Sequence, residues 1–194
     1  MNSKLEETKK IEKDKQGEKY LSLIYSYERR PVSNYPIKLA KEIIKRNNIK
    51  LKSKLLDVGC GRGDLLKAFK KNELIVEGAD LSEESINILS PIKVHQKNLE
   101  KEIIEGKSGY YDVIFSKSLI EHLNSPLKFI KNCKSLLKDD GCLIILTPSW
   151  YHHSFGPFYL DYTHVTPFTL HSLRDIGKLA GFSSIKVEYF YQLP

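Results

Sequence analysis

Apolar residues of this chain fall into short continuous runs that alternate with segments in which they recur at helical spacing. The runs predict buried strands at residues 55–58, 75–80, 92–95, 111–116 and 142–148. Strands that alternate with helices at these intervals require right-handed crossovers, which give a parallel sheet covered on both faces. We therefore predict an α/β fold with a doubly wound, Rossmann-like, mostly parallel sheet and helices on both faces.

Capping residues set the ends of the later elements. Gly141 is placed to end the helix before the fifth strand, as its C′ residue. A further helix is predicted to begin with Thr166 as N-cap and Pro167 at its first position, and to end at Gly181. Residues 184–191 then predict one more strand.

The first strand runs into a turn with glycine at every second position, Gly59, Gly61 and Gly63. Such a turn lets the backbone approach a ligand closely, because no Cβ intervenes. A dinucleotide fingerprint would need a third glycine at Asp64, and a carboxylate there, like that of Asp57, repels a pyrophosphate. Two acids around a glycine turn suit a ligand with cationic groups and no phosphate. S-adenosylmethionine, with an ammonium and a sulfonium, fits this requirement better than NAD.

A second acid stands at the end of the second predicted strand. Asp80 follows Gly61 by 19 residues, close to the ~20-residue spacing at which an acid meets ribose hydroxyls in a βαβ unit. Ser82 follows as the predicted N-cap of the next helix. Ligands of parallel sheets bind at the carboxyl ends of the strands, where these acids lie.

At this point the chain resembles the class I S-adenosylmethionine-dependent methyltransferases, in particular their polysaccharide-biosynthesis and ubiquinone-type O-methyltransferases. The group's pattern runs LDVGCGxG, GxDxS, FDxIxxxxxxEHL and LLxxGGxLxxxTP. The matching segments here are residues 56–63, 78–82, 111–123 and 136–148. The resemblance covers roughly residues 50–190 and is specific for cofactor and fold, but says little about the methyl acceptor.

The resemblance implies a role for each matching residue of the cofactor site. Asp57 and the glycine turn would hold the methionine end, Asp80 the ribose, and Leu81 and Leu99 the adenine. Asn98 stands where the family often has Asp, and its amide oxygen can still accept a hydrogen bond. The cofactor-binding residues expected are Asp57, Gly59, Cys60, Gly61, Gly63, Asp80, Leu81, Asn98, Leu99, Ser116 and Lys117, with Cys60 there as a small packing residue.

Glu121 and His122 are the candidates for chemistry. A hydroxyl acceptor must lose a proton, and a histidine with a pKa near neutrality suits the role of base; the alternative is a histidine that only orients the loop. His164 is the third catalytic candidate, since the family's later histidine falls in a similar place. Some relatives bind a divalent metal through E-x-x-E-H, but Ser118 occupies the first Glu position, so we predict no metal site.

Aromatic residues crowd the stretch 149–169, after the fifth strand. Loops at this edge of a sheet carry substrate recognition. The run from Asp161 to Thr169 resembles methyltransferases of polysaccharide and glycan biosynthesis, which implies an acceptor hydroxyl on a sugar or a sugar-linked metabolite. The alternative is an aromatic cluster that seals the sheet edge.

Composition limits the remaining possibilities. A length of 194 residues suits one domain. We divide the chain into a charged N-terminal extension, 1–19, and a single methyltransferase domain, 20–194, with a helical cover at 20–50 and the catalytic α/β core at 53–194. Three cysteines beside predicted elements, with no membrane span or signal peptide in the sequence, indicate a cytoplasmic protein with no membrane partner.

The net charge of +7 is concentrated in residues 28–54, which hold nine Lys or Arg residues against two acids. This segment could be a solvated helix face, or it could bind RNA, which makes an RNA or tRNA methyltransferase the alternative function. A second alternative is a non-catalytic relative that only binds the cofactor. The family's sheet usually ends with an antiparallel strand that this chain lacks, and an open sheet edge would favour a homodimer.

Overall fold

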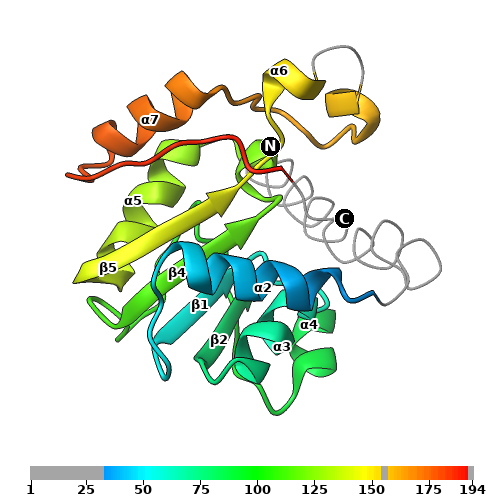
Figure 1. The fold of residues 1–194 in the computed structure, drawn as a ribbon, viewed down its shortest axis with the longest axis vertical. Coiled ribbons are helices and arrows are strands. Elements are labelled where there is room, and N and C mark those ends of the chain that lie inside the picture. Colours follow the sequence, from blue (N-terminus) through cyan, green and yellow to red (C-terminus); the bar gives the residue numbers. More distant parts are fainter. Residues whose placement is uncertain (1–32, 154–156, 192–194) are drawn as a thin grey trace, which may run out of the picture.

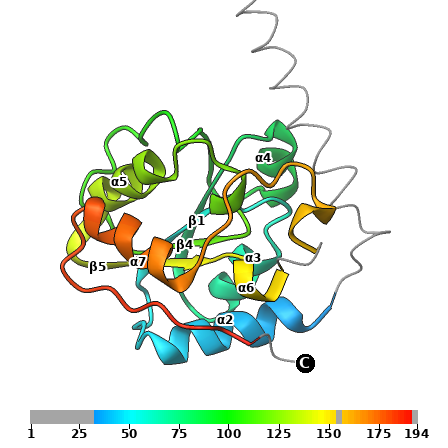
Figure 2. The same ribbon diagram turned by 90° about the horizontal axis from the view of Figure 1, so that it is seen from above.

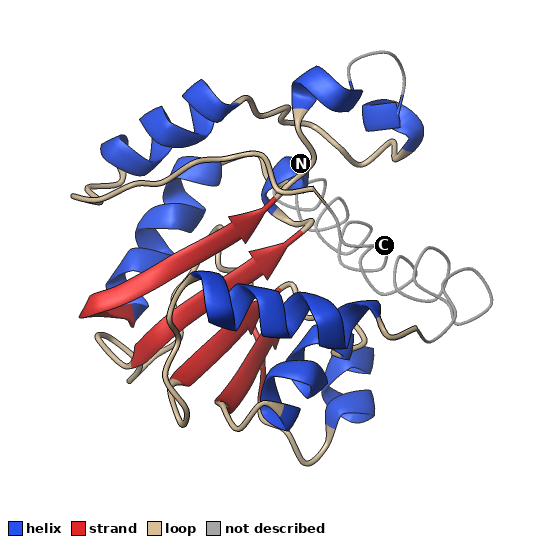
Figure 3. Cartoon of the chain, in the orientation of Figure 1, coloured by secondary structure: helices blue, strands red, loops and turns tan. Residues whose placement is uncertain are grey.

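The computed structural model describes residues 33–153 and 157–191 and contains one five-stranded sheet. The strands are β1 (Lys54–Val58), β2 (Ile75–Asp80), β3 (Val94–Gln96), β4 (Tyr111–Lys117) and β5 (Leu137–Leu146). Their order is β3-β2-β1-β4-β5, and every neighbouring pair is parallel (Figure 3). The doubly wound α/β prediction is confirmed for these strands.

Helices cover both faces of the sheet (Figures 1 and 2). On one face, α2 (Tyr35–Arg46) and α3 (Asp64–Lys71) pack against β1 and β4 through a buried cluster that includes Leu39, Leu55, Phe69 and Phe115. On the other face lie α5 (Pro126–Leu136) and α7 (Leu170–Leu179). The remaining helical segments are α4 (Glu83–Leu89), η1 (Ile120–His122), α6 (Trp150–His153) and η2 (Pro157–Leu160).

The sequence of β1 explains why this strand is central. Leu55 and Leu56 are both fully buried, because successive side chains point to opposite faces and each face carries helices. The register pairs Val58 with Ala79 of β2 on one side and with Ser116 of β4 on the other. The carboxyl ends of these three strands therefore meet at one edge of the sheet.

Three expectations about element ends were wrong. Thr169, not Thr166, caps α7, whose first residue is Leu170 and not Pro167; the Thr169 side chain accepts from Ser172 N in a capping box. Thr166 instead donates to the carbonyl oxygen of Leu123, 2.9 Å away, so a long-range partner replaces the local one. Gly141 does not end α5, which stops at Leu136; it lies inside β5, where a Cβ would approach Tyr111 O to 3.0 Å.

Residues 183–191, expected to contain a sixth strand, form no strand. The segment runs alongside β5 and is held by side chains: Glu188 pairs with Arg46, whose guanidinium lies over the Phe190 ring. A groove of about 730 Å³ separates it from β5. Among the described residues, β5 pairs with β4 only, so its other edge faces this groove. The expected extension 1–19, and residues 20–32 of the helical cover, lie outside the described residues.

Candidate functional site

Three glycines set the conformation of the turn between β1 and α3. Gly59, Gly61 and Gly63 have φ values of 74°, 49° and 71°, in the left-handed region that favours glycine. Gly63 also packs against Leu89, because a Cβ on Gly63 would lie 2.1 Å from Leu89 Cδ2. The amides of the turn donate within the chain: Gly59 N to Ala79 O and Gly63 N to Cys60 O, each at 2.8 Å.

We expect Gly63→Ala to destabilise the protein by about 2–5 kcal/mol, from the left-handed backbone and the overlap with Leu89 together. Gly106→Ala is the matched control. Gly106 has a φ of 68°, but nothing lies within 4 Å of an added Cβ, so its replacement by alanine should lower the free energy of unfolding by only about 1–2 kcal/mol. Urea unfolding measures both; equal losses would show that contact with Leu89 does not constrain the turn.

Asp80, at the end of β2, is tied to this turn. Its Oδ2 accepts from Gly61 N at 2.8 Å and its Oδ1 from Ser82 N at 2.9 Å. Burial raises the pKa of Asp80, although these hydrogen bonds oppose the rise. A carboxylate has about four lone-pair sites, so two remain for a ligand in the cavity.

Asp57, on β1, lies near Asp80 of β2 and is 3% exposed. Burial raises its pKa to about 7, the neighbouring charge of Asp80 adds to the rise, and Lys117 opposes it. A buried carboxylate and a half-buried one at the same cavity favour a cation between them. This electrostatic preference agrees with the argument made from the sequence against a pyrophosphate.

A cavity of about 760 Å³ opens over the carboxyl ends of β1, β2 and β4. Most of the expected cofactor residues contribute to its wall: Asp57, Gly59, Cys60, Gly61, Gly63, Asp80, Leu81, Asn98, Leu99 and Lys117. Leu81 is 54% exposed, so an apolar surface is offered at the wall. Arg62 and Tyr35 also line the wall but were not expected from the sequence, and Asp64, singled out there only as an acid of the turn, lines it too.

Ser116 is the exception among the expected cofactor residues. It is 1% exposed, does not line the cavity, and donates from Oγ to the carbonyl oxygen of Val58 at 3.0 Å. Its place near the end of β4 suggested a ligand contact, but its hydroxyl binds the backbone of β1 instead. Asn98 does line the wall, and its Oδ1 accepts from Glu100 N at 3.0 Å.

His122 lies in the cavity wall, and its ring is oriented by a hydrogen-bonded chain. Thr163 Oγ1 donates its single proton to Asp161 Oδ1 at 2.6 Å, so it accepts from His122 Nδ1 at 2.8 Å. The lone pair of the neutral ring is therefore on Nε2. Burial lowers the pKa of His122, and His164 lowers it further, while Asp161 opposes the shift. His122 is accordingly neutral at pH 7.

Glu121 and His164 lie next to His122 but outside the cavity wall. The His122 and His164 rings are 4.6 Å apart, and His164 Nδ1 donates to the carbonyl oxygen of Phe158 at 2.6 Å. Glu121 is fully buried; its Oε2 accepts from Thr147 Oγ1 at 3.0 Å, and its Oε1 has no hydrogen-bond partner among the described residues. Burial raises the pKa of this carboxyl.

Metal-ligand atoms of Glu121, His122 and His164 all lie within 4.8 Å of one another. Their types suit a divalent metal. The sequence predicted no metal site, and chelation by EDTA, which would strip a metal from this cluster, tests that prediction. The relay residues Thr163 and Asp161 were not singled out from the sequence, although both stand in the run from Asp161 to Thr169.

Comparison with known proteins agrees with this geometry. The methyltransferase domain family matches residues 28–187. A crystal structure of a SAM-dependent methyltransferase from Archaeoglobus fulgidus is 26% identical, covers 87% of this chain and 77% of that one, and superposes with a TM-score of 0.69. A Haemonchus contortus N-methyltransferase solved with S-adenosylhomocysteine, 22% identical over 78% of this chain and 38% of that one, shares the fold with a TM-score of 0.64.

Among curated proteins, the ubiquinone biosynthesis O-methyltransferase of Coxiella burnetii is 36% identical over 106 residues, which are 51% of this chain and 45% of that protein. The chain thus spans about half the length of the curated relatives that it matches. The glycine turn, the two carboxylates and the apolar wall at Leu81 fit the cofactor of these enzymes. The chain belongs to the methyltransferase domain family, and its cofactor is S-adenosylmethionine.

Proposed function

We propose that this protein transfers the methyl group of S-adenosylmethionine to a hydroxyl oxygen of a small acceptor, with His122 as the general base. The observation that carries the proposal is the neutral, oriented His122 in the wall of the cofactor cavity. When bound, the cofactor supplies an electrophilic methyl on its sulfonium. The chain must then hold the acceptor in line with it and remove a proton.

On the part of the cavity that holds the methyl donor, which we call the donor side, Asp80 and Asp57 each contact the cofactor. Asp80 accepts hydrogen bonds from the ribose hydroxyls with the lone pairs that Gly61 and Ser82 leave available. Asp57 attracts the ammonium of the methionine part. Leu81 and Leu99 contact the adenine, and Asn98 accepts from its amino group. These roles extend the family pattern to residues that the cavity wall contains.

On the acceptor side, His122 Nε2 takes the hydroxyl proton as the oxygen attacks. The positive charge that develops on the ring is stabilised through Nδ1–H, Thr163 and Asp161. Glu121 and His164 position His122 from behind the wall. In this assignment Glu121 and His164 act through His122, whereas the sequence suggested direct catalytic roles for them.

For the acceptor we propose a phenolic hydroxyl. Aromatic side chains of Tyr35, Phe129 and Tyr162 contribute to the cavity wall. The curated relatives are named for ubiquinone biosynthesis, and none of those compared here is named for carbohydrate synthesis. The sugar acceptor expected from the run after Asp161 thus has no support in these comparisons.

Methyl transfer from labelled cofactor to a panel of acceptors tests the proposal. The panel contains catechols and other simple phenols, nucleotide sugars and unmodified tRNA. Turnover on phenols supports the proposal, and turnover confined to sugars or to tRNA contradicts it. Cofactor binding with no transfer to any of them would favour the non-catalytic alternative. Calorimetry with S-adenosylhomocysteine and NAD first establishes that the purified chain binds the adenosyl ligand.

Cofactor affinity should depend on pH through Asp57. The pKa of Asp57 is about 7 without ligand, and a cationic ligand favours the ionised carboxylate, so binding should release a proton. We expect affinity about tenfold weaker at pH 6 than at pH 8, with the loss developing as pH falls through 7. Calorimetry in buffers of different ionisation enthalpy measures the proton release. Asp57→Asn should bind weakly and almost independently of pH; if this variant kept the wild-type pH dependence, the assignment would be contradicted.

For partners, we propose that a second copy pairs along the open edge of β5. The supporting observation is that, among the described residues, this edge has no neighbouring strand and faces a groove. No helix within the described ranges is long and apolar enough to cross a membrane.

A further inference from the structure

Six exposed lysines lie on α2 and α3: Lys38, Lys41 and Lys45 on α2, and Lys67, Lys70 and Lys71 on α3. We call them the lysine face. Lys38, Lys41 and Lys45 are three and four residues apart, and Lys70 and Lys71 follow Lys67 by three and four residues, which places the lysines of each helix on one side. On α2 this side is opposite the buried Leu39, Ala40 and Ile43. The lysines therefore point away from the core.

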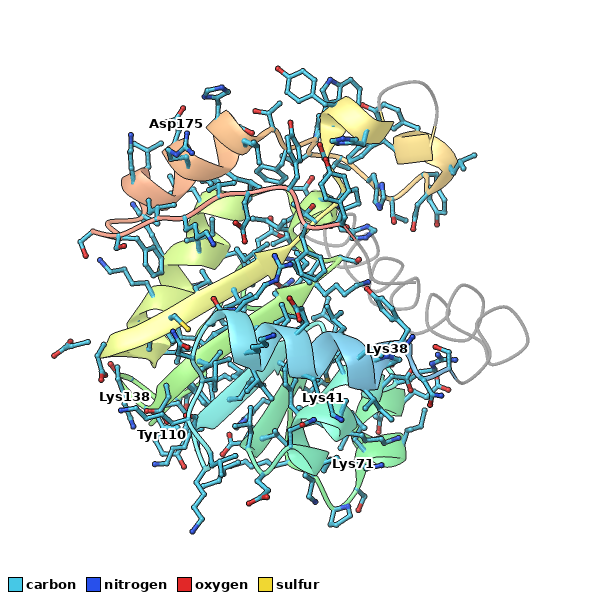
Figure 4. All side chains as sticks on the ribbon, viewed as in Figure 1. Lys38, Lys41, Lys71, Tyr110, Lys138 and Asp175 are labelled. Carbon is cyan, nitrogen blue, oxygen red and sulfur yellow. The ribbon has the colours of Figure 1, made fainter. Side chains whose placement is uncertain are left out.

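The two helices form one layer. Both pack into the same buried cluster on the same face of the sheet. Figure 4 shows Lys38, Lys41 and Lys71 on the near side of this layer. The lysine side chains of both helices thus project in the same general direction, and together they make one positively charged surface.

The acids of these helices do not neutralise this surface. α2 contains one acid, Glu42, which pairs with Arg46, and α3 contains one, Asp64, which pairs with Arg62 at 2.7 Å. Each acid is thus engaged by an arginine. The next acid in sequence, Glu73, is exposed in the turn after α3. Lysines therefore outnumber the acids that α2, α3 and this turn contain, which favours a positive potential at this surface.

The residue types indicate what kind of anion would bind. The lysine ammonium is a point charge without the planar fork by which arginine reads phosphates and bases, and both arginines here are tied to carboxylates. Neither helix offers an exposed aromatic ring: Phe69 is buried and Tyr35 is half-buried. Single-stranded RNA recognition depends on such rings for base stacking. A layer of lysines alone suits a surface of spread negative charge.

We propose that the lysine face docks the protein on an anionic lipid bilayer, by electrostatic attraction and without insertion. Each lysine near such a surface adds about 1 kcal/mol, which is about fivefold in the partition coefficient. Lys67 and Lys71 also contribute to the wall of the cofactor cavity, so a docked protein holds this wall close to the headgroups. The contact requires no membrane-spanning helix, and it does not depend on the identity of the methyl acceptor.

The test is sedimentation with lipid vesicles of phosphatidylcholine alone or with one third phosphatidylglycerol. The full chain should bind the anionic vesicles at low salt and release them as salt rises, since the Debye length shortens. The variant K41Q/K45Q/K70Q removes three lysines that are exposed and do not line the cavity. It should partition about 100-fold more weakly.

The matched control is K101Q/K128Q/K131Q, which makes the same change of charge at exposed lysines outside α2 and α3. It should keep most of the binding, and both variants should bind S-adenosylhomocysteine like the parent protein, which shows that they are folded. Equal loss in the two variants, binding that K41Q/K45Q/K70Q does not weaken, or tighter binding to tRNA than to anionic vesicles would each overturn the proposal. Failure of methyl transfer would leave this result unaffected, because no acceptor is present.

Discussion

Replacement of Asp80 by alanine or asparagine should weaken S-adenosylmethionine binding at least about 100-fold. The carboxylate would lose its hydrogen bonds to the ribose, and charge-assisted bonds of this kind contribute about 1.5–3 kcal/mol each. The replacement would also release Gly61 N and Ser82 N, which donate to the Asp80 carboxylate at 2.8 and 2.9 Å. The glycine turn would then lose a contact that fixes its position, so binding should weaken on both accounts. Isothermal calorimetry measures the effect.

Asp112→Asn is the control for this experiment. Asp112 stands near the start of β4, at the opposite end of the strands from the cavity, and accepts from Lys54 N at 2.7 Å. Its replacement should leave cofactor affinity unchanged. A folded Asp80 variant that binds within tenfold of the parent protein would remove Asp80 from the donor site.

The second large effect is expected at His122. His122→Gln should bind the cofactor normally and lower kcat by about 10²–10⁴-fold, the usual contribution of a general base. Thr163→Val, which interrupts the chain to Asp161, should lower kcat less, by about tenfold, because the ring remains but loses its orientation. Steady-state kinetics with the acceptor found in the screen separates kcat from KM.

The pH profile distinguishes a base from a structural histidine. Because burial lowers the pKa of His122, the neutral ring dominates at pH 7, and kcat at saturating cofactor should fall only as pH drops through that lowered pKa. Chelation by EDTA should leave the rate unchanged. A rate lost on chelation and restored by a divalent metal would instead assign His122, Glu121 and His164 to a metal centre. A His122→Gln variant with unchanged kcat would make the residue structural.

Most residues that local sequence signals assigned to the donor half of the site lie in the wall of one cavity. The glycine turn follows directly from residue type, because left-handed backbone at positions 59, 61 and 63 favours glycine. Asp80 could be predicted because parallel neighbours bring consecutive strand ends together. Ser116 shares the strand end but lies outside the cavity wall, because its hydroxyl donates to the carbonyl oxygen of Val58 on β1.

Features that depend on distant contacts could not be predicted from local patterns. Thr166 has the sequence context of a cap, but its hydroxyl binds Leu123, 43 residues away. The Thr163–Asp161 relay requires the loop to fold back onto η1, which no periodicity encodes. The positive charge was assigned to residues 28–54, whereas the lysine face also draws on α3, which packs beside α2 only in the folded chain.

The separation of the two halves of the cavity has a consequence for how such enzymes diversify. The cofactor contacts that we propose come from three short segments near residues 57–63, 80–82 and 97–99, all before β4, and from Lys117 at the end of β4, whereas His122 and its relay come from segments after it. Insertions or exchanges in the loop from 149 to 169 can therefore reshape the acceptor pocket while leaving cofactor affinity intact. A lineage can explore new acceptors by altering one surface loop, and each intermediate keeps a working methyl donor.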